Sequence, residues 1–336
     1  MTTTRKLNQV RNSFYVYLPR QWCDRFNLTK HSEVKIEQTP DGTLRVIPPD
    51  FESKDAENLT FLVHPGSRES VVNLLIGAYM VGVDSLTVTF ADELDMGTRE
   101  DVSRWIRRLP GFEILEEHNE GFVISDTSEK QVITPVLKRQ FSTTKYMLTS
   151  LVTAMKEGAP DDTSRILDRD EDVDRHRYFV ERLCHLSLQD PSYARKIAMS
   201  PPDALHFSLA AKYVERIADH ICGATTEVIN LKDVGVPFTH LSEELAKVYD
   251  DTMSVFFAVD SGRREKRDLI EESQEAFDSL KRAQALASEL STLETSREGY
   301  SSHQVLLAMH LERVASYCAD IGEVAINRTI EARLQD

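Results

Sequence analysis

The sequence predicts a multidomain protein of 336 residues, with a small β domain, a small α/β domain and an all-α helical bundle in that order. Three observations predict this. Residues 1–50 contain short alternating apolar stretches between turn signals, which is typical of strands. Residues 51–130 follow a βαβαββ order. Residues 131–336 are divided by glycines and prolines into six long helices, and an internal repeat relates the two halves.

The internal repeat has a constant offset of 97 residues. Residues 208–219 (SLAAKYVERIAD) recur as residues 305–316 (VLLAMHLERVAS), with five identical pairs. Self-similarity at a fixed offset indicates duplicated structural units. With three helices per unit, it predicts a duplicated three-helix bundle with repeats at about 131–233 and 237–336. The predicted helices span 132–157, 161–187, 202–231, 240–261, 264–291 and 300–334.

Each repeat carries acidic residues beside its apolar stripe. Glu215 and Asp219 are four residues apart, so both carboxylates lie on one helix face. Like charges at this spacing repel, and a hard cation bound between them would remove that cost. The alternative is an ordinary solvated acidic face. In the second repeat, Ser316 stands at the position of Asp219, which argues against a second complete site. His220 follows Asp219 and is expected to pack or cap rather than bind metal.

The sequence Val-Glu-Arg-Ile-Ala-Asp-His at residues 214–220, with its second copy, resembles the PhoU family of phosphate-uptake regulators. The resemblance covers roughly residues 130–336. It implies a duplicated three-helix bundle whose Glu-x-x-x-Asp motifs bind multinuclear metal clusters of Mg, Mn, Fe or Zn, with no organic cofactor. The metal ligands that it implies are Asp170, Glu171, Asp174, Glu215 and Asp219. Weaker candidates in the second repeat are Glu271, Asp278, Glu312 and Asp320.

Residues 1–50 predict a strand at 14–18, a helix at 20–26, and a hairpin of strands 34–37 and 44–47 around Pro40-Asp41-Gly42. So short a unit buries little apolar surface alone, which favours dimerisation.

The N-terminal pattern resembles the AbrB/SpoVT/MazE swapped-hairpin domain. The residues that carry this resemblance are Arg5-Lys6-Leu7, Val10, Ser13 to Pro19, Trp22, Leu28 and Asp41 to Leu44. It implies that two chains interleave their hairpins into one small β barrel that binds DNA as a homodimer. Arg11-Asn12 stands where relatives often have glycines, and Asn12 is expected to tolerate the left-handed conformation.

The charge is distributed unevenly along the chain. The net charge is −15, whereas residues 1–50 contain eight basic and five acidic residues, so the remainder carries −18. A basic segment on an acidic body is typical of a nucleic-acid-binding head. The candidate phosphate or base contacts are Arg5, Lys6, Arg11 and Arg20. The alternative is a head that only dimerises.

The middle segment, 51–130, predicts strands at 58–64, 86–90, 112–116 and 121–124, with helices after Ser67 and at 98–108. The expected fold is a ferredoxin-like or ACT-like α/β sandwich. This segment contains no glycine-rich phosphate loop and no nucleophile motif.

The composition excludes several classes of protein. The four cysteines form no Cys-x-x-Cys pair, so neither a zinc ribbon nor a thioredoxin motif is present. Cys184, Cys222 and Cys318 lie in apolar helical patterns and are expected to be buried thiols. The absence of an 18-residue apolar run or a signal peptide predicts a cytoplasmic protein without membrane insertion.

Together these features predict a phosphate-responsive regulator rather than an enzyme, with a DNA-binding head and a metal-binding PhoU-like body. The expected partners are DNA and a second copy of the chain, with a phosphate-transporter ATPase or a sensor histidine kinase as further candidates. Two alternatives remain: an adaptor of a phosphate transporter that binds no DNA, and a metal-dependent phosphoesterase.

Overall fold

The computed structural model describes most of the chain, which divides into two compact units, Met1–Ala56 and Glu57–Asp336. Each unit is described here by itself. The residues that the structure describes are 4–38, 42–49, 58–64, 68–128, 132–158, 163–259, 269–295 and 299–334.

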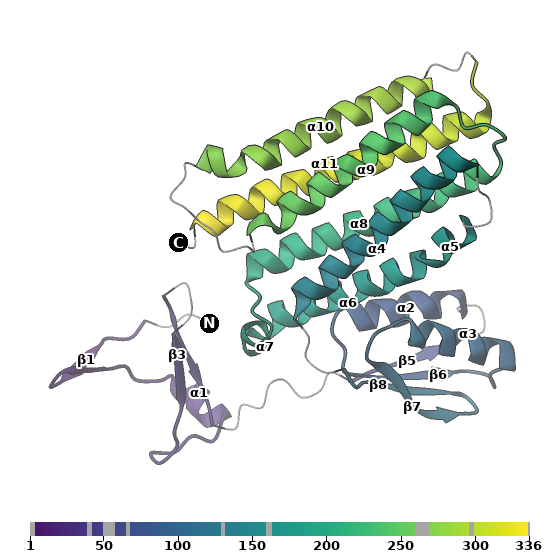
Figure 1. Cartoon of the computed structure of the whole chain (residues 1–336). Helices are drawn as coiled ribbons and strands as arrows, with labels where there is room; N and C mark the ends of the chain where they lie inside the picture. Colours follow the sequence, from purple (N-terminus) through teal and green to yellow (C-terminus); the bar gives the residue numbers. More distant parts are fainter. Residues whose placement is uncertain are drawn as a thin grey trace. The chain divides into compact units, whose positions relative to one another are not determined.

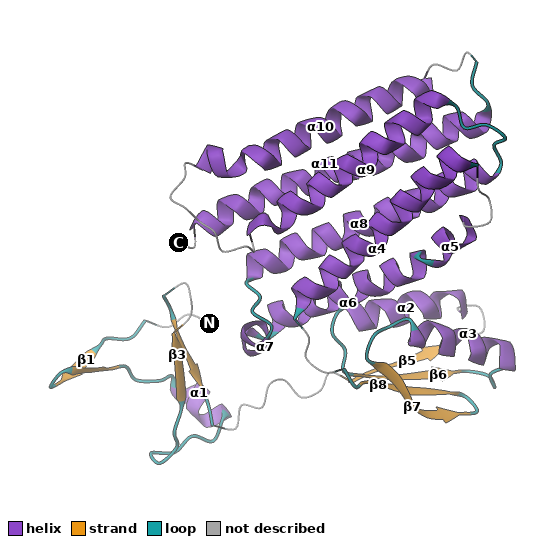
Figure 2. Ribbon diagram, in the orientation of Figure 1, coloured by secondary structure: helices purple, strands orange, loops and turns teal. Residues whose placement is uncertain are grey.

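The N-terminal unit consists of two separate antiparallel hairpins and a short helix (Figure 2). Within its described residues the two hairpins do not pair with each other, so one chain alone forms no barrel. The elements are β1 (Asn8–Val10), β2 (Ser13–Tyr15), α1 (Arg20–Arg25), β3 (Lys35–Gln38) and β4 (Leu44–Ile47).

The turn between β1 and β2 contains a left-handed residue, as the sequence predicts, but at a different position. Arg11 has φ 55°, and Asn12 is not among the residues with positive φ. The side chain of Gln9 donates a hydrogen bond of 3.0 Å to the Arg11 carbonyl, which stabilises this turn. In the second hairpin Gly42 has φ 79°, a conformation that favours glycine. Pro40 and Asp41 of the predicted turn lie outside the described residues.

The second unit begins with a four-stranded mixed sheet covered by two helices. Its elements are β5 (Asn58–Val63), α2 (Arg68–Met80), β6 (Ser85–Phe90), α3 (Met96–Arg107), β7 (Phe112–His118) and β8 (Gly121–Asp126). The strand order is β5-β6-β8-β7, with β5 and β6 parallel and the other pairs antiparallel. The helices α2 and α3 lie on the face of the sheet that is turned toward the helical bundle (Figure 1). Residues alternate in burial along β6, as expected of a strand with one covered face.

The predicted βαβαββ order is confirmed, but the ferredoxin-like topology is wrong. That topology has the order βαββαβ. Here the tight connection at Asn119 and Glu120 joins β7 directly to β8, so both strands follow α3 and β8 pairs with β6. The second helix also begins earlier than predicted, at Met96, because the Asp95 side chain caps it by accepting a hydrogen bond of 2.9 Å from the Thr98 amide. Ser67, the predicted cap of the first helix, lies outside the described residues.

The rest of the second unit is helical. The helices are α4 (Ile133–Glu157), α5 (Thr163–Asp168), α6 (Asp170–Gln189), α7 (Pro191–Lys196), α8 (Pro201–Ile229), α9 (Val236–Ala258), α10 (Leu269–Thr295) and α11 (Ser302–Leu334). In the described part of the chain, no helix is long and apolar enough to cross a membrane.

Two differences from the predicted helices have a local cause. The helix predicted at 161–187 is broken at Arg169 into α5 and α6, because aspartates are poor helix formers and repel one another at short spacing. The new helix then begins with Asp170, Glu171 and Asp172, where the helix dipole favours acidic side chains. The short helix α7 was not predicted; Pro191 stops α6 and occupies the first turn of α7.

The repeated segments form the centre of the bundle, where α8 packs against α11. Seven apolar pairs related by the 97-residue offset are fully buried on both helices: Ala210/Leu307, Ala211/Ala308, Val214/Leu311, Ile217/Val314, Ala218/Ala315, Ile221/Cys318 and Ala224/Ile321. The sequence repeat is therefore a repeat of core positions, and the helical bundle is confirmed.

Candidate functional site

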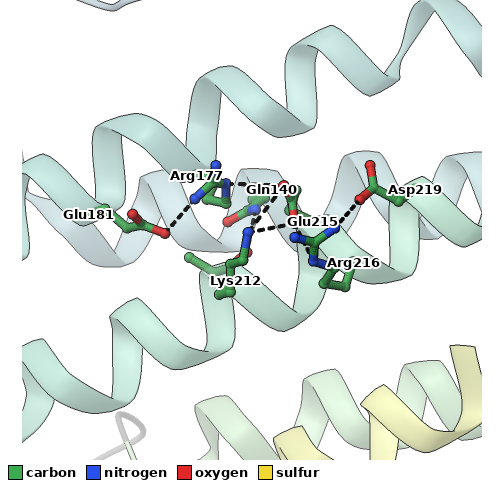
Figure 3. Close-up of polar contacts among 8 residues, drawn as sticks. Gln140, Arg177, Glu181, Lys212, Glu215, Arg216 and Asp219 are labelled. Atoms are coloured by element: carbon green, nitrogen blue, oxygen red, sulfur yellow. Dashed lines mark hydrogen bonds and ion pairs between the residues drawn. The ribbon is translucent and has the colours of Figure 1, made fainter. Parts of the chain in front are cut away.

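The predicted acidic motif lies on α8, where that helix faces α6 (Figure 3). Glu215 is 7% exposed, although an unpaired carboxylate is costly to bury. The side chain is buried because it lies on the same helix face as the core residues Ala211 and Ala218. Next to it, the fully buried Gln140 of α4 donates a hydrogen bond of 2.9 Å to the Ala211 carbonyl and so ties α4 to α8.

Three basic side chains surround Glu215. The Lys212 Nζ lies 3.3 Å from Glu215 Oε2, Arg177 Nε of α6 lies 3.4 Å from Oε1, and Arg216 Nε lies 3.6 Å from Oε2. The same cations continue the network, since Arg216 Nη1 is 3.0 Å from Asp219 and Arg177 Nη1 is 2.8 Å from Glu181. Three carboxylates and three cations therefore alternate between α6 and α8, and we call them the ion-pair chain.

Two further carboxylates of α6, Asp170 and Asp174, face this ion-pair chain and form no ion pair with a cation of the described residues. Burial, and then the charge of Asp170, raises the pKa of Asp174 to about 6. Burial and the charges of Asp219 and Glu215 also raise the pKa of Asp170, and burial with Glu215 raises that of Asp219. One buried oxygen of Asp170, Oδ1, has no hydrogen-bond partner in the part of the chain that the structure describes. The structure thus brings Asp170, Asp174, Glu215 and Asp219 into one electrostatic cluster.

Glu171 does not belong to this cluster. Its carboxylate forms an ion pair with Arg108, at the C-terminal end of α3. Adjacent residues on a helix point in directions about 100° apart, so Glu171 cannot face α8 together with Asp170 and Asp174. Glu171 therefore lies outside the cluster around Glu215, and its role as a metal ligand stays a prediction.

The remaining acids do not fit a metal centre as they are arranged. Among the residues that the structure describes, no three His, Cys, Asp or Glu side chains are placed to hold one ion. A hard cation needs several carboxylate oxygens that converge on it. Here both oxygens of Glu215 and one of Asp219 are instead within reach of Lys212, Arg177 and Arg216. The structure therefore does not assemble the predicted metal centre of the first repeat.

The second repeat departs further from the predicted metal site. Ser316 Oγ donates a hydrogen bond of 2.7 Å to Glu312 Oε1, and Arg313 lies 3.5 Å from the other oxygen. Asp278 accepts a hydrogen bond of 2.9 Å from Gln274 on the exposed face of α10, where Glu271 is also exposed. Burial and then the charge of Glu323 raise the pKa of Asp320. These four candidates form no metal-binding group within the described residues.

The candidate nucleic-acid contacts lie on the N-terminal unit. Arg5 and Lys6 precede β1, Arg11 lies in the first turn, and Arg20 begins α1; all four are exposed. Arg20 lies 3.8 Å from Asp24, so its charge is partly compensated. The other three present their charge to solvent.

One cluster between α8 and α11 was missed. The Nδ1 atoms of His220 and His310 are 3.0 Å apart, and the His220 ring stacks on Tyr317 at 5.9 Å between centroids. Tyr317 stacks in turn on Tyr213 at 6.0 Å. The signal lay in the repeat itself, because the 97-residue offset relates Tyr213 to His310 and His220 to Tyr317. Two aromatic pairs at equivalent positions of two central helices are the signal from which this cluster could have been predicted.

The cysteines follow the prediction in part. Cys184 and Cys318 are buried, whereas Cys222 is only partly buried. Burial raises the pKa of all three thiols to about 12, so they are not reactive thiolates.

Comparison with known proteins gives a domain-level match. Residues 137–225 match the family model of the PhoU domain. This stretch contains α6, most of α8 and every residue of the ion-pair chain. A structural match covers 61% of this chain and 94% of the phosphate transport system regulatory protein PhoU from Streptococcus pneumoniae, with 16% sequence identity and a TM-score of 0.41. No curated protein sequence matches the chain.

Proposed function

We propose that this chain, which contains a PhoU domain match over residues 137–225, regulates phosphate uptake in response to phosphate supply. One observation carries the proposal. The matched residues include the buried Glu215 and its ion-pair partners, so the match covers core positions of the first repeat. The helical body would be the responsive part. The proposal includes no bound metal ion, because Arg177, Lys212 and Arg216 already form ion pairs with the carboxylates of Glu215 and Asp219.

The N-terminal unit supports a homodimer within this proposal. Its apolar side chains are solvent-exposed in the single chain: Leu7 is 68%, Phe14 66%, Tyr17 74% and Leu44 69% exposed, and α1 buries no residue. Trp22 is half-buried and contacts only the neighbouring Phe26 ring among the aromatic residues described. A soluble unit does not leave so many large apolar groups in water, and pairing with the same unit of a second chain would cover them.

The same unit supports DNA as the partner. Arg5, Lys6 and Arg11 are exposed and carry positive charge on a chain whose remaining part is strongly acidic. In a dimer each of these charges occurs twice, and neutralising DNA phosphates releases counterions, so binding should weaken steeply with salt. Transcription of phosphate-uptake genes is then the most direct output of the regulator.

The test measures DNA binding and regulation together. Wild-type protein, Arg5→Ala with Arg11→Ala, and a control of equal charge change, Lys232→Ala with Lys281→Ala, are titrated with DNA from upstream of phosphate-transporter genes at several salt concentrations. We expect the first pair to weaken binding at least tenfold and to flatten the salt dependence, and the control pair to change neither. Phosphate-transporter expression in cells lacking the chain should lose its response to phosphate supply.

Two outcomes would contradict parts of this function. If wild-type protein binds no DNA but its loss still abolishes the phosphate response, the chain is an adaptor that acts on the transporter ATPase or a sensor histidine kinase. If loss of the chain leaves the response intact, the regulatory proposal fails. A monomer at micromolar concentration in light scattering would contradict the homodimer.

A further inference from the structure

A cavity of about 690 Å³ lies between α4 and α6, with Pro110 of the connection before β7 contributing to its lining. Two neighbouring cavities have volumes of about 510 Å³ and 250 Å³; both share its lining residue Arg175, and the smaller also shares Asp172. Ligand pockets in proteins typically have volumes of this size, roughly 300–1,000 Å³. We call the largest of the three the arginine cavity.

Helical spacing produces the lining. On α4, Val136, Arg139 and Thr143 recur at intervals of three and four residues after Val132, so they form one stripe. On α6, Asp172, Arg175, His176 and Phe179 have the same spacing and form the facing stripe. The arginine cavity is therefore built on two long helices, which hold its side chains at fixed positions.

Positive charge dominates the arginine cavity and its smallest neighbour. Their linings contain two carboxylates, Glu171 and Asp172, against six arginines: Arg104, Arg107, Arg108, Arg139, Arg169 and Arg175. The third cavity adds Glu113 and Glu117, so the excess of positive charge lies on the side of α4 and α6. Such a concentration of arginine is unexpected in a chain with a net charge of −15.

Half of these arginines already have acidic partners. Arg104 pairs with Asp101, Arg108 with Glu171, and Arg169 with Asp172. The other three, Arg107, Arg139 and Arg175, make no ion pair with any residue in the described ranges. Two of the unpaired three, Arg139 and Arg175, line the arginine cavity itself.

Apolar side chains make up much of the rest of the lining. Pro110, Val132, Pro135, Val136 and the buried Phe179 contribute carbon surface beside the arginines. A small inorganic anion would contact the guanidinium groups and leave this surface in water. An anion that also carries an organic group would use both parts of the lining.

We propose that the arginine cavity binds an organic phosphate, with its phosphate groups on Arg139 and Arg175 and its organic group against Val136 and Phe179. The guanidinium group is planar and donates two parallel hydrogen bonds, a geometry that matches phosphate oxygens. Thr143, whose hydroxyl donates a hydrogen bond of 3.0 Å to the Arg139 carbonyl, also faces the cavity. Because Pro110 of the α/β part also lines the arginine cavity, the bound ligand would contact both the α/β part and the bundle.

His176 provides an internal reporter for this binding. Burial lowers its pKa, and the nearby Arg139 and Arg175 lower it further. An anion bound between these arginines would screen their charge, so the pKa of His176 should rise when the cavity is filled.

The test is isothermal titration of full-length protein with ATP as the organic phosphate, and with tripolyphosphate and inorganic phosphate as the inorganic anions. Binding is compared in wild type, in Arg139→Gln with Arg175→Gln, and in the control Lys232→Gln with Lys281→Gln, whose lysines lie outside the cavity. Because Arg139 and Arg175 are exposed and form no ion pair with another described residue, their replacement should leave the thermal melt unchanged.

We expect wild type to bind ATP more tightly than either inorganic anion. The affinity for ATP should fall about tenfold for each arginine removed and should be unchanged in the lysine control. Nuclear magnetic resonance should show the pKa of His176 rising with ATP. ATP binding that is absent from wild type, or equal in the arginine variant, would overturn the site. Equal or tighter binding of tripolyphosphate or inorganic phosphate would overturn the assignment of an organic phosphate. This inference is independent of DNA binding by the N-terminal unit.

Discussion

The Nδ1 atoms of His220 and His310 face each other at 3.0 Å across α8 and α11. One nitrogen must donate and the other accept, so the contact requires at least one neutral ring. Burial, and then the charge of His310, lowers the pKa of His220 to about 4, and burial lowers that of His310. The two repeats of the bundle are therefore joined by a pair that tolerates protonation poorly.

This pair predicts loss of stability in acid. An unfolded histidine binds a proton below about pH 6.5, whereas folded His220 does so only near pH 4, so the unfolded state binds more protons in between. The free energy of unfolding should fall by about 1–2 kcal/mol as pH drops from 6.5 to 4, a value reduced because both rings are only half-buried. Urea unfolding of His220→Phe should show a shallower pH dependence. The same pH dependence in His220→Phe as in wild type and the control His185→Gln would contradict this.

A side chain introduced at Gly223 should disturb the packing beside the His220–His310 pair. A Cβ atom at this position would lie 2.2 Å from His310 Cε1, so Gly223→Ala should destabilise the fold by about 1–3 kcal/mol through overpacking. Adding His310→Ala removes the obstacle, and the double variant should recover much of that loss in a double-mutant cycle. As a control, Gly77→Ala in α2 meets no atom within 4 Å and should stabilise the protein by about 0.5–1 kcal/mol. Equal effects at both glycines would refute the steric explanation.

The carboxyl group of Asp174 should make the free energy of unfolding depend on pH in the opposite direction. Its folded pKa of about 6 exceeds its usual value of 3.8, so the folded state binds more protons between these values and stability falls as pH rises through this window. Asp174→Asn should therefore be more stable than wild type by about 1–2 kcal/mol at pH 7.5, allowing for its partial exposure, and should lose that advantage near pH 4. Thermal melts at both pH values measure this. A gain independent of pH, or an equal gain in the exposed control Asp168→Asn, would contradict the assignment.

The stability of the protein should depend strongly on the buried guanidinium group of Arg182. This arginine of α6 is 1% exposed and donates hydrogen bonds to the Tyr79 carbonyl at 2.6 Å, the Val83 carbonyl at 3.1 Å and Asp126 at 2.5 Å. Arg182→Ala should cost about 3–5 kcal/mol, because Asp126 would be left with an unpaired charge.

Two further variants show whether the loss of stability in Arg182→Ala arises from the unpaired charge of Asp126 and from the loss of the planar guanidinium group. Adding Asp126→Asn to Arg182→Ala should recover part of the loss in urea unfolding. Arg182→Lys should recover little, since a lysine cannot reach three acceptors in that fork geometry. A loss of stability below about 1 kcal/mol in Arg182→Ala would show that the hydrogen bonds of Arg182 do not anchor the α/β part to the helical bundle.

The ion-pair chain predicts how metals and motif variants behave. Because Glu215 is held by Lys212, Arg177 and Arg216, Glu215→Gln should destabilise the protein by about 1–3 kcal/mol, and adding Asp219→Asn should change this loss little, since the pKa of Asp219 is raised in the fold. A metal centre predicts the reverse, since removing repelling carboxylates would stabilise the metal-free protein. Mg²⁺ or Mn²⁺ should likewise leave the melting temperature of wild type unchanged. A rise that depends on these two acids would restore the metal hypothesis.

The sequence alone determined the elements and their repetition. Periodic apolar positions and breakers predicted most helices within a few residues, because helix and strand formation depends on neighbours close in the chain. The 97-residue offset identified α8 and α11 as equivalent, and both proved to be the core of the bundle. Where local signals conflicted, as in the acidic run that breaks at Arg169, the helix limits were missed.

Only the tertiary structure decided which side chains meet across different helices. Arg177 and Glu215 are 38 positions apart, and Arg139 and Arg175 line one cavity from two helices. Periodicity assigns a residue to a face of its own helix, but the rotation and register of the neighbouring helix determine what that face contacts. For this reason the sequence predicted that Glu215 and Asp219 share one face of α8, while the cations beside them and the arginine cavity emerged only from the packing of α4, α6 and α8.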